Sequence, residues 1–380
     1  MSQQQAVQQL PAEALHAGEL AFLAAWDGGE RPRGWRLTPR AAVTFVAGSG
    51  GEQLRLPRRA SDGLPRSLSV PAKFVGNRAL VERAVVTLAG ERGLMLVGEP
   101  GTAKSMLSEL LAAAVSGTGS LTVQGTAGTT EEHLRYGWNY ALLIAKGPHA
   151  EALVPSPVMA AMRRGAIARV EEVTRCLPEV QDALVSILSE RRLAVPELGE
   201  DGTVFAAHGF NLVATANLRD RGVSEMSAAL KRRFNFELVE PIPDLELETE
   251  LVRRQATAAL ARVGAELRLD DVVLSALVTA FRDLRIGRSV EGWAVEKPGS
   301  VMSTAEAVGV ATSLGLSTAY FTPADPLALL PGYLLGVVRK DDPQDQARLL
   351  GYWDSTVKRR ADEGSQTWGR LWEMRTALEE

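Results

Sequence analysis

A glycine-rich turn that ends in a lysine and a serine carries the clearest chemistry in this sequence. The turn spans residues 98–105, follows the apolar run 94–97 and precedes leucines at helical spacing in 106–111. A strand, a glycine turn and a helix in this order form a phosphate-binding loop, because inward-pointing backbone N–H groups and the helix N-terminus both attract anions. We therefore expect Lys104 to reach the β- and γ-phosphates of a nucleotide, and the Ser105 hydroxyl to bind Mg²⁺.

The residue before the lysine departs from the usual form of such a loop. Ala103 stands where glycine is common. We expect Ala103 to adopt an ordinary helical backbone, in which alanine is tolerated. A glycine-rich turn that precedes a helix without binding a ligand is the alternative, and the flanking strand and helix favour the phosphate loop.

Two carboxylates follow another apolar strand. Residues 165–170 run directly into Glu171 and Glu172. The first carboxylate would hold Mg²⁺ through water, and the second would polarise the water that attacks a phosphate. An acidic strand end without a chemical role is the alternative, and the phosphate loop favours the nucleotide site. Asn217 ends the apolar run 210–216 and can hydrogen-bond the same water or the γ-phosphate, although asparagine also caps turns.

The composition is that of an ordinary globular protein. The chain has 380 residues, of which 46% are hydrophobic and 23% charged, and its net charge is −4. This charge argues against a protein dedicated to coating nucleic acid. Cys176 has no partner for an internal disulfide, and the four histidines lack metal-ligand spacing, so we assign no structural metal. Because the pattern contains neither a signal peptide nor a membrane span, we expect a cytoplasmic protein.

Hydrophobic periodicity predicts four parts. We expect a helical, arginine-rich extension over 1–69, an α/β nucleotide-binding domain over 70–242, a helical lid over 243–335 and amphipathic helices over 336–380. The expected strands lie at 94–97, 121–124, 165–170, 192–195, 204–206, 210–217 and 235–239, with a Gly-Glu-Asp-Gly turn inside the hairpin 192–206. The expected helices lie at 11–26, 38–48, 77–90, 178–193, 245–262, 270–285 and 303–314.

Two surface features each allow two interpretations. The arginines of the extension favour a solvated surface over a nucleic-acid or acidic-partner patch, because Trp35 is the sole aromatic residue interleaved with them. Near the end of the chain, Trp353, Trp368 and Trp372 lie at helical spacing. We expect these tryptophans to pack against the body of the protein, and a partner-docking face is the alternative.

Together these residues resemble the AAA+ ATPases, and within them the MoxR-like group with its helix-2 insert. The turn 98–105 is similar to the Walker A motif, and Val170–Arg175 is similar to the MoxR Walker B motif and its continuation. The hairpin 192–206 matches the insertion of this branch, and the resemblance covers about residues 70–320. It implies a P-loop AAA+ parallel five-stranded sheet between helices, an α-helical lid domain, and a ring, usually a hexamer, with ATP and Mg²⁺ at the subunit interfaces.

The resemblance also implies roles for individual residues. Glu172, Lys104 and Asn217 would be catalytic, with Asn217 as the sensor 1 residue. Arg233, or Arg232, would be the arginine finger that acts on the neighbouring subunit. The residues on the metal side would be Ser105 and Glu171. The residues that hold the nucleotide would be Val75, Gly76, Gly98, Glu99, Pro100, Gly101, Thr102, Ala103, Lys104, Ser105 and Met106.

Three departures from the family pattern affect the expected activity. Glu171 stands where the family has aspartate, so its carboxylate is one methylene farther from the backbone. Ala103 replaces glycine. The segment 303–306, Ser-Thr-Ala-Glu, matches the position of the sensor 2 arginine and contains no arginine. This loss argues against fast hydrolysis and nucleotide-coupled closure of the lid.

Three functions remain open from the sequence. The first is an ATP-hydrolysing, chaperone-like remodelling factor that acts on a protein partner, for which the MoxR-like resemblance implies a von Willebrand factor A domain protein. The second is a nucleic-acid-dependent motor, which is weaker because the leading 70 residues are short for a dedicated DNA-binding region. The third is a nucleotide-gated scaffold that binds ATP and barely hydrolyses it, motivated by Glu171 and the missing sensor 2 arginine.

Overall fold

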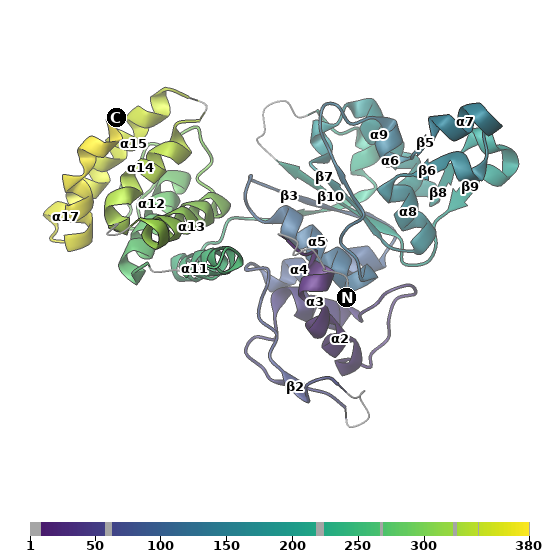
Figure 1. The fold of residues 1–380 in the computed structure, drawn as a ribbon, viewed down its shortest axis with the longest axis horizontal. Helices are drawn as coiled ribbons and strands as arrows, with labels where there is room; N and C mark the ends of the chain where they lie inside the picture. The colour runs from purple at the N-terminus through teal and green to yellow at the C-terminus, as the bar shows by residue number, and fades with distance from the viewer. Residues whose placement is uncertain are drawn as a thin grey trace. The chain divides into compact units, whose positions relative to one another are not determined.

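The protein is described by a computed structural model that covers residues 9–57, 63–217, 224–266, 269–321, 325–340 and 342–379. The chain divides into two compact units (Figure 1). Residues 1–99 and 103–239 form the first, which we call the α/β unit, and residues 100–102 and 240–380 form the second, the helical unit.

A parallel sheet lies at the centre of the α/β unit. Its five strands follow the order β11-β3-β10-β7-β4, and every neighbouring pair is parallel. The strands are β3 (Gly93–Gly98), β4 (Thr122–Gln124), β7 (Ile167–Glu171), β10 (Asn211–Asn217) and β11 (Phe234–Leu238). The predicted five-stranded parallel sheet is therefore confirmed, and the expected strand positions agree with these bounds to within a few residues.

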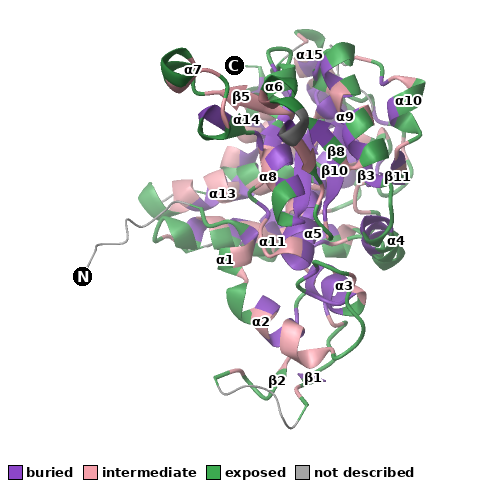
Figure 2. Cartoon of the chain, turned by 90° about the vertical axis from the view of Figure 1, so that its right-hand side faces the viewer, coloured by how far each residue is buried: buried purple, intermediate pink, exposed green. Residues whose placement is uncertain are grey.

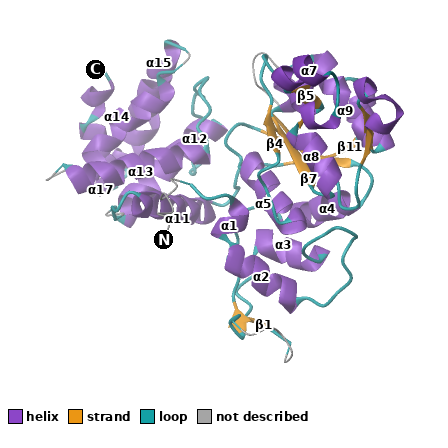
Figure 3. Ribbon diagram, turned by 45° about the vertical axis from the view of Figure 1, so that its right-hand side comes forward, coloured by secondary structure: helices purple, strands orange, loops and turns teal. Residues whose placement is uncertain are grey.

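Helices cover both faces of this sheet (Figure 3). Alternate residues of a strand point to opposite faces. Accordingly Leu94 and Leu96 of β3 belong to one hydrophobic cluster and Met95 to another. The first cluster contains side chains of α4 (Arg78–Ala89) and α5 (Lys104–Ser116), and the second those of α8 (Pro157–Arg164) and α9 (Pro178–Glu190). The helix expected over 178–193 therefore ends at Glu190, and Leu193 belongs to a strand.

The leading helices pack on the first of these clusters. They are α1 (Ala12–Leu15), α2 (Ala17–Trp26) and α3 (Pro39–Ala47). The expected helix over 11–26 is interrupted at His16, whereas α3 begins as predicted, with the Thr38 hydroxyl accepting from the backbone N–H of Ala41 at 3.1 Å. Phe22 and Phe45 are fully buried in the core that also contains α4 and α5. A short hairpin follows, formed by β1 (Leu54–Arg55) and β2 (Ser67–Leu68).

Two further hairpins extend from the sheet. The predicted one pairs β8 (Arg192–Ala194) with β9 (Thr203–Phe205). In place of a tight turn, the segment Pro196–Gly202 joins its strands and is 3₁₀-helical on both sides of a break at Gly199. The other was not predicted and pairs β5 (Tyr136–Trp138) with β6 (Leu153–Pro155) around α7 (Tyr140–Lys146). None of the residues of α7 is buried (Figure 2), although its sequence, Tyr-Ala-Leu-Leu-Ile-Ala-Lys, is mostly apolar and Ile144 is 86% exposed. Short helical segments complete this unit: α6 (Glu131–Leu134), Ala150–Ala152, Val173–Arg175 and α10 (Ala228–Lys231).

The helical unit consists of helices around a core of its own. They are α11 (Leu245–Arg262), α12 (Asp271–Ile286), α13 (Thr304–Tyr320), α14 (Pro326–Val338), α15 (Gln344–Tyr352), a π-helical turn (Trp353–Val357), α16 (Lys358–Asp362), α17 (Gln366–Glu373) and a 3₁₀ turn (Arg375–Leu378). The expected bounds of α11 are confirmed, α13 continues beyond the expected Leu314, and α14 was not predicted.

The tryptophans of the last helices pack inward, as expected. Trp353 is fully buried, and Trp368 and Trp372 pack partly buried against the same core. Cys176, in the α/β unit, is also fully buried, and burial raises the pKa of its thiol. Within the described parts of the chain, no helix combines the length and the apolar character that a membrane span requires.

Candidate nucleotide-binding site

The glycine-rich turn joins the carboxyl end of β3 to the first turn of α5. Gly101 has φ 76° and Ala103 has φ 63°, so both adopt left-handed backbone conformations. The expectation of an ordinary helical backbone at Ala103 was wrong. An alanine in this conformation brings its Cβ too close to the backbone, at a cost of roughly 1–2 kcal/mol. The family's usual glycine avoids this strain, which explains why Ala103 is a real departure from the pattern.

Lys104 lies beneath this turn. Its side chain is buried, with the residue 7% exposed, and its Nζ donates to the carbonyl oxygens of Gly98 at 3.2 Å and Glu99 at 2.7 Å. The ammonium is therefore held at the loop by the loop's own backbone. A cation at that place complements the phosphates that such a loop binds.

The Glu171 carboxylate, at the end of β7, accepts four hydrogen bonds. Its Oε2 accepts from the hydroxyls of Ser105 at 2.7 Å and Thr215 at 2.8 Å. Its Oε1 accepts from the Ser108 hydroxyl at 2.5 Å and from Arg169 Nη2 at 2.8 Å. These donors come from α5, β10 and β7, three elements that meet at this edge of the sheet.

The electrostatics of Glu171 favour the ionised form. Burial alone would raise its pKa, since the residue is 4% exposed. The hydrogen bond from Ser108, the positive charge of Arg169 and the hydroxyls of Ser105 and Thr215 outweigh burial, so its pKa lies below the ordinary value. A charged carboxylate is thus kept beside the phosphate loop.

Ser105 and Glu171 fit a magnesium ion by the chemistry of their donors. Mg²⁺ prefers hard oxygen ligands, and a hydroxyl and a carboxylate are such ligands. Because Ser105 donates its proton to Glu171, the lone pairs of the hydroxyl stay available to a cation. The expected metal pair is therefore brought together, and the extra methylene of Glu171 is accommodated within the network.

Glu172 occupies a strained position directly after β7. Its φ is 51°, a left-handed value that is uncommon for residues other than glycine. Its backbone N–H donates to the Thr215 hydroxyl at 2.9 Å, and its carboxylate pairs with Arg175 at 2.9 Å. Strain of this kind is often found at functional sites, where surrounding contacts maintain it.

Asn217 lies on the neighbouring strand at the level of the loop. In the parallel pairing of β10 with β3, Asn217 is the register partner of Gly98, the first residue of the turn. The carboxyl ends of β3, β7 and β10 therefore present Lys104, Glu172 and Asn217 at one edge of the sheet. Residues 218–223, which follow Asn217, lie outside the described residues.

The two predicted arginines lie at the opposite end of the strands, where β3 and β11 begin. Arg233 precedes β11, and its carbonyl accepts from the N–H of Gly93, the first residue of β3. The length of β3 separates this end from Gly98, about 16 Å at the usual rise per strand residue. Arg233 donates to the Ser189 hydroxyl and to the Ala229 carbonyl, both at 2.8 Å, and Arg232 is exposed. Neither arginine joins the Lys104 group of its own chain.

The predicted adenine-side residues lie on the segment that leads into α4. Val75 is half-buried and Gly76 is exposed, directly before the helix cap Asn77. Met106, on the first turn of α5, packs partly buried against the core of the α/β unit. These positions leave the assignment of an adenine contact as a prediction.

Sequence reasoning missed the groups that hold Glu171. Ser108, Arg169 and Thr215 were not singled out, although each contacts its carboxylate. One signal was available for Arg169, because it is the only charged residue of the otherwise apolar run 166–170. Serine and threonine in buried elements are too common to have indicated the other two contacts.

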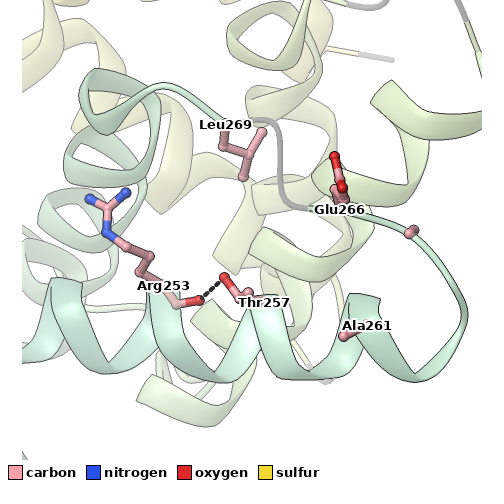
Figure 4. Close-up of a pocket in the computed structure, with 6 residues that line it drawn as sticks. Arg253, Thr257, Ala261, Glu266 and Leu269 are labelled. Carbon is pink, nitrogen blue, oxygen red and sulfur yellow. Dashed lines mark hydrogen bonds between the residues drawn. The ribbon is translucent and has the colours of Figure 1, made fainter.

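A cavity of about 370 Å³ opens in the helical unit, beside α11 (Figure 4). Its lining residues are Arg253, Thr257, Ala261, Ala265, Glu266 and Leu269. The Thr257 hydroxyl donates to the Arg253 carbonyl at 2.8 Å, and the Arg253 guanidinium pairs with Asp271 at 2.6 Å. None of the predicted site residues lines this cavity.

Two family models match the chain. Residues 93–234 match the AAA domain of the dynein-related subfamily, and residues 246–379 match the YehL-like AAA+ ATPase C-terminal domain. The chain is 46% identical over 357 residues to the uncharacterized protein YehL of Escherichia coli strain K12, an alignment that covers 92% of this chain and 93% of YehL. The chain belongs to the YehL-like AAA+ ATPases.

More distant relatives share part of the chain. The uncharacterized protein SH1500 of Staphylococcus haemolyticus is 29% identical over 211 residues, which cover 55% of this chain and 74% of SH1500. Among solved structures, NtrX from Brucella abortus in complex with ADP is similar with a TM-score of 0.46 and 14% identity, over 80% of this chain and 69% of NtrX. The same protein in complex with ATP gives a TM-score of 0.47 and 13% identity, over 81% and 69% of the two chains. Membership of the YehL-like family places the phosphate loop and the carboxylate strand in an AAA+ domain.

Proposed function

We propose that this AAA+ protein hydrolyses ATP, with Mg²⁺, to drive chaperone-like remodelling of a protein partner. The observation that carries the proposal is the group of Lys104, Ser105, Glu171 and Glu172 at the carboxyl ends of β3 and β7. Such a group can bind the phosphates of a nucleotide and direct a water molecule at the terminal one.

Each residue of this site would have a separate role in ATP hydrolysis. The backbone of the loop and Lys104 would bind the phosphates, and Ser105 and Glu171 would hold the metal ion. Mg²⁺, when bound, would neutralise charge on the β- and γ-phosphates. Glu172 would accept a proton from the attacking water, and Asn217 would orient that water.

A ring of identical subunits would complete the site. Arg233 and Arg232 lie at the opposite end of the strands from the loop, so they cannot serve the loop of their own chain without a large rearrangement. Placed at a subunit interface, one of them would approach the phosphates bound by the neighbour. This arrangement supports a homo-oligomeric ring, for which we propose a hexamer, as in the MoxR-like group that the motifs resemble.

The partner would be a protein in the cytoplasm. The net charge of −4 disfavours a nucleic-acid motor. The MoxR-like resemblance of the Walker motifs supports a von Willebrand factor A domain protein as the client.

One observation favours a second candidate, a nucleotide-gated scaffold. The segment that would carry the sensor 2 arginine caps α13: the Ser303 hydroxyl accepts from the N–H of Glu306 at 3.2 Å, and Glu306 accepts from the N–H of Ser303 at 3.0 Å. This segment therefore serves as a helix cap and supplies no positive charge. Such a protein would bind ATP and turn it over very slowly.

Steady-state ATP turnover across a series of protein concentrations separates the two candidates. The remodelling ATPase predicts turnover per subunit that rises with concentration and falls to background in Glu172→Gln. Arg233→Ala should lower turnover by about 10³- to 10⁵-fold while nucleotide binding persists, because an arginine finger acts on the transition state. Turnover equal to that of Glu172→Gln, with ATP still bound, would instead identify the scaffold.

Turnover that Arg233→Ala leaves at the level of the unmodified protein would rule out Arg233 as the finger. Arg232→Ala is then the next variant, since Arg232 is the exposed neighbour on the same turn. Stimulation of turnover by DNA or RNA that falls steeply with salt would point to the motor.

A further inference from the structure

Arg169 is a buried arginine in the middle of the sheet. It lies on β7, two residues before Glu171, and is 7% exposed. A guanidinium in such a place needs partners for its charge and for all its N–H groups.

Every donor of Arg169 has an acceptor. Nε donates to the Ser108 hydroxyl at 2.9 Å, and Nη2 donates to the Ser105 carbonyl at 2.9 Å and to Glu171 Oε1 at 2.8 Å. Nη1 donates to the Gly119 carbonyl at 2.7 Å and to the Thr122 hydroxyl at 3.1 Å. Because a guanidinium has five N–H hydrogens, these five bonds satisfy it completely and fix its orientation.

We propose that Arg169 is a positioning residue that holds the longer Glu171 side chain at the metal side of the nucleotide. The inference rests on the proposed function, since it concerns the magnesium ion that ATP would bring. Arg169 would act through Glu171 and through the backbone of Ser105, because protein acceptors take all five of its N–H groups.

The two oxygens of Glu171 have separate tasks. Oε1 is taken by Arg169 and Ser108, whereas Oε2 accepts from Ser105 and Thr215. The oxygen bonded to Arg169 anchors the carboxylate, and the other is presented beside the hydroxyl that would ligate the metal. An exposed glutamate would sample several rotamers, and anchoring one oxygen removes that freedom.

Arg169 also explains how glutamate can stand where the family pattern has aspartate. Aspartate is one methylene shorter and would hold its carboxylate close to the strand without help. The extra methylene places the Glu171 carboxylate where the guanidinium two residues earlier can reach it. We therefore expect Arg169 and Glu171 to act as a coupled pair. The guanidinium reaches the carboxylate because the glutamate side chain is long enough.

Arg169 also contacts the second metal-side residue, because it donates to the Ser105 carbonyl. Ser105 is the second residue of α5, and its hydroxyl and its carbonyl both belong to the network. The guanidinium thus links the first turn of α5 to the loop before β4 through Gly119. Loss of Arg169 should loosen both metal-side residues at once.

The test measures nucleotide binding with and without the metal in the full chain. A fluorescent ATP analogue is titrated in excess EDTA, and Mg²⁺ is then titrated into the complex. Arg169→Met is expected to weaken Mg²⁺ binding about 10- to 100-fold, the usual effect of removing a partner of a metal ligand. Affinity for the analogue in EDTA should stay unchanged, because Arg169 does not touch the phosphates.

Two variants guard against simple destabilisation. Arg360→Met removes a buried arginine in the helical unit, where Arg360 donates to Glu291 at 2.9 and 2.7 Å, and it should leave Mg²⁺ affinity unchanged. Arg169→Lys keeps the charge but not the fork of donors, so its Mg²⁺ affinity should fall between those of the unmodified protein and Arg169→Met.

A shorter carboxylate at residue 171 tests whether the longer Glu171 side chain and Arg169 depend on each other. Glu171→Asp alone should weaken Mg²⁺ binding, because the shorter carboxylate withdraws from Arg169. Combined with Arg169→Met, it should cost less than the sum of the two single changes, since residues that act as one unit are not additive. Additive losses would show that the pair is not a unit.

Failure of the inference and failure of the proposed function give different results. If the unmodified protein shows no Mg²⁺-dependent nucleotide binding, the proposed function is wrong. If it binds Mg²⁺ with the nucleotide and the folded Arg169→Lys and Arg169→Met variants bind it equally well, the positioning role is overturned. Should Arg169→Met fail to fold, Arg169→Lys and Glu171→Asp decide alone, and unchanged Mg²⁺ affinity in both overturns it.

Discussion

Each unit of the protein contains a buried arginine paired with a buried carboxylate, and the two pairs differ in their surroundings. The strand cluster in the α/β unit consists of Arg169, Glu171 and the hydroxyls of Ser105, Ser108 and Thr215. The helix cluster in the helical unit consists of Arg360, Asp283, Tyr352 and Glu291. In the helix cluster, Arg360 lies 2.8 Å from Asp283 and donates to Glu291 at 2.9 and 2.7 Å.

The two carboxylates respond to burial in opposite directions. Glu171 accepts from three hydroxyls and one guanidinium, so its pKa falls below the ordinary value despite burial. Burial raises the pKa of Asp283, even though Arg360 and the Tyr352 hydroxyl, at 2.9 Å, both act to lower it. Tyr352 is itself buried, and burial raises the pKa of its hydroxyl well above the ordinary value. Hydroxyl donors, more than the arginine, distinguish the carboxylate whose pKa is lowered from the one whose pKa is raised.

The backbone shows the same contrast. Among the described residues, the three non-glycine residues with positive φ, which are Ala103, Glu172 and Arg191, all lie in the α/β unit. Two of them flank the phosphate loop and the carboxylate strand. The helix cluster joins helices whose described residues have no such conformation. We infer that the strand cluster is organised for a ligand and the helix cluster for stability.

The largest expected effect is on the helix cluster. Arg360→Met should lower the free energy of unfolding by about 3–5 kcal/mol, because removing one partner of a buried ion pair leaves the other charge uncompensated. Denaturant unfolding followed by tryptophan fluorescence measures it. Arg359→Met, at the exposed neighbouring residue that lies over the Trp293 ring, should cost less than about 1 kcal/mol. Equal losses of unfolding free energy in both variants would show that the buried ion pair stabilises the protein no more than the exposed Arg359 does.

The next effect concerns the hydroxyl in the helix cluster. Tyr352→Phe should destabilise the protein by about 1–3 kcal/mol, because Asp283 loses a buried donor and Arg360 loses an acceptor. Tyr333→Phe is the matched control, since within the described part of the chain the Tyr333 hydroxyl bonds only the half-buried Ser317, at 2.7 Å. Thermal unfolding of both variants compares them, and a larger loss in the Tyr333 variant would contradict this ranking.

Ala103→Gly should change stability in the other direction. Glycine adopts the left-handed conformation without strain, so we expect a gain of roughly 1 kcal/mol once its greater flexibility in the unfolded chain is subtracted. Ala258→Gly, at an exposed position inside α11, should instead cost about 1 kcal/mol. Opposite signs in chemical unfolding support strain at the loop, and a loss at both positions would refute it.

The smallest expected effect is a difference in pH dependence. The folded state lowers the pKa of Glu171, so its contribution to stability is present above pH 4.5, the ordinary value, and is lost as pH falls below it. The folded state raises the pKa of Asp283, so its contribution is present below the ordinary value of 3.8 and is lost as pH rises through the higher folded value.

Glu171→Gln and Asp283→Asn test these signs separately. The cost of Glu171→Gln, relative to the unmodified protein, should shrink as pH is lowered from 6 toward 4. The cost of Asp283→Asn should grow over the same range. Unfolding free energies measured at three pH values give both slopes, and slopes of the same sign would mean that burial dominates at both carboxylates.

The sequence determined the local parts of the site. The turn 98–105 with its flanking strand and helix, the run into Glu171 and Glu172, and the strand that ends at Asn217 are each encoded within a few consecutive residues. Glycine spacing and hydrophobic periodicity depend only on near neighbours, so they could be identified without the tertiary structure. For the same reason the change to an all-helical unit after residue 243 was predictable, whereas the parallel sheet was predicted from the resemblance to the AAA+ ATPases.

Only the tertiary structure decided how these parts meet. The contact between Ser108 and Glu171 joins residues 63 positions apart, and that between Asp283 and Tyr352 joins residues 69 apart. The left-handed backbone of Ala103 and the unpredicted hairpin around α7 also depend on packing, not on local preference. Arg169 is the clearest case: in the sequence it is a charge inside an apolar strand. Its role becomes visible only where α5 and the loop before β4 bring acceptors to all five of its N–H groups, because a buried charge is stable only with such partners.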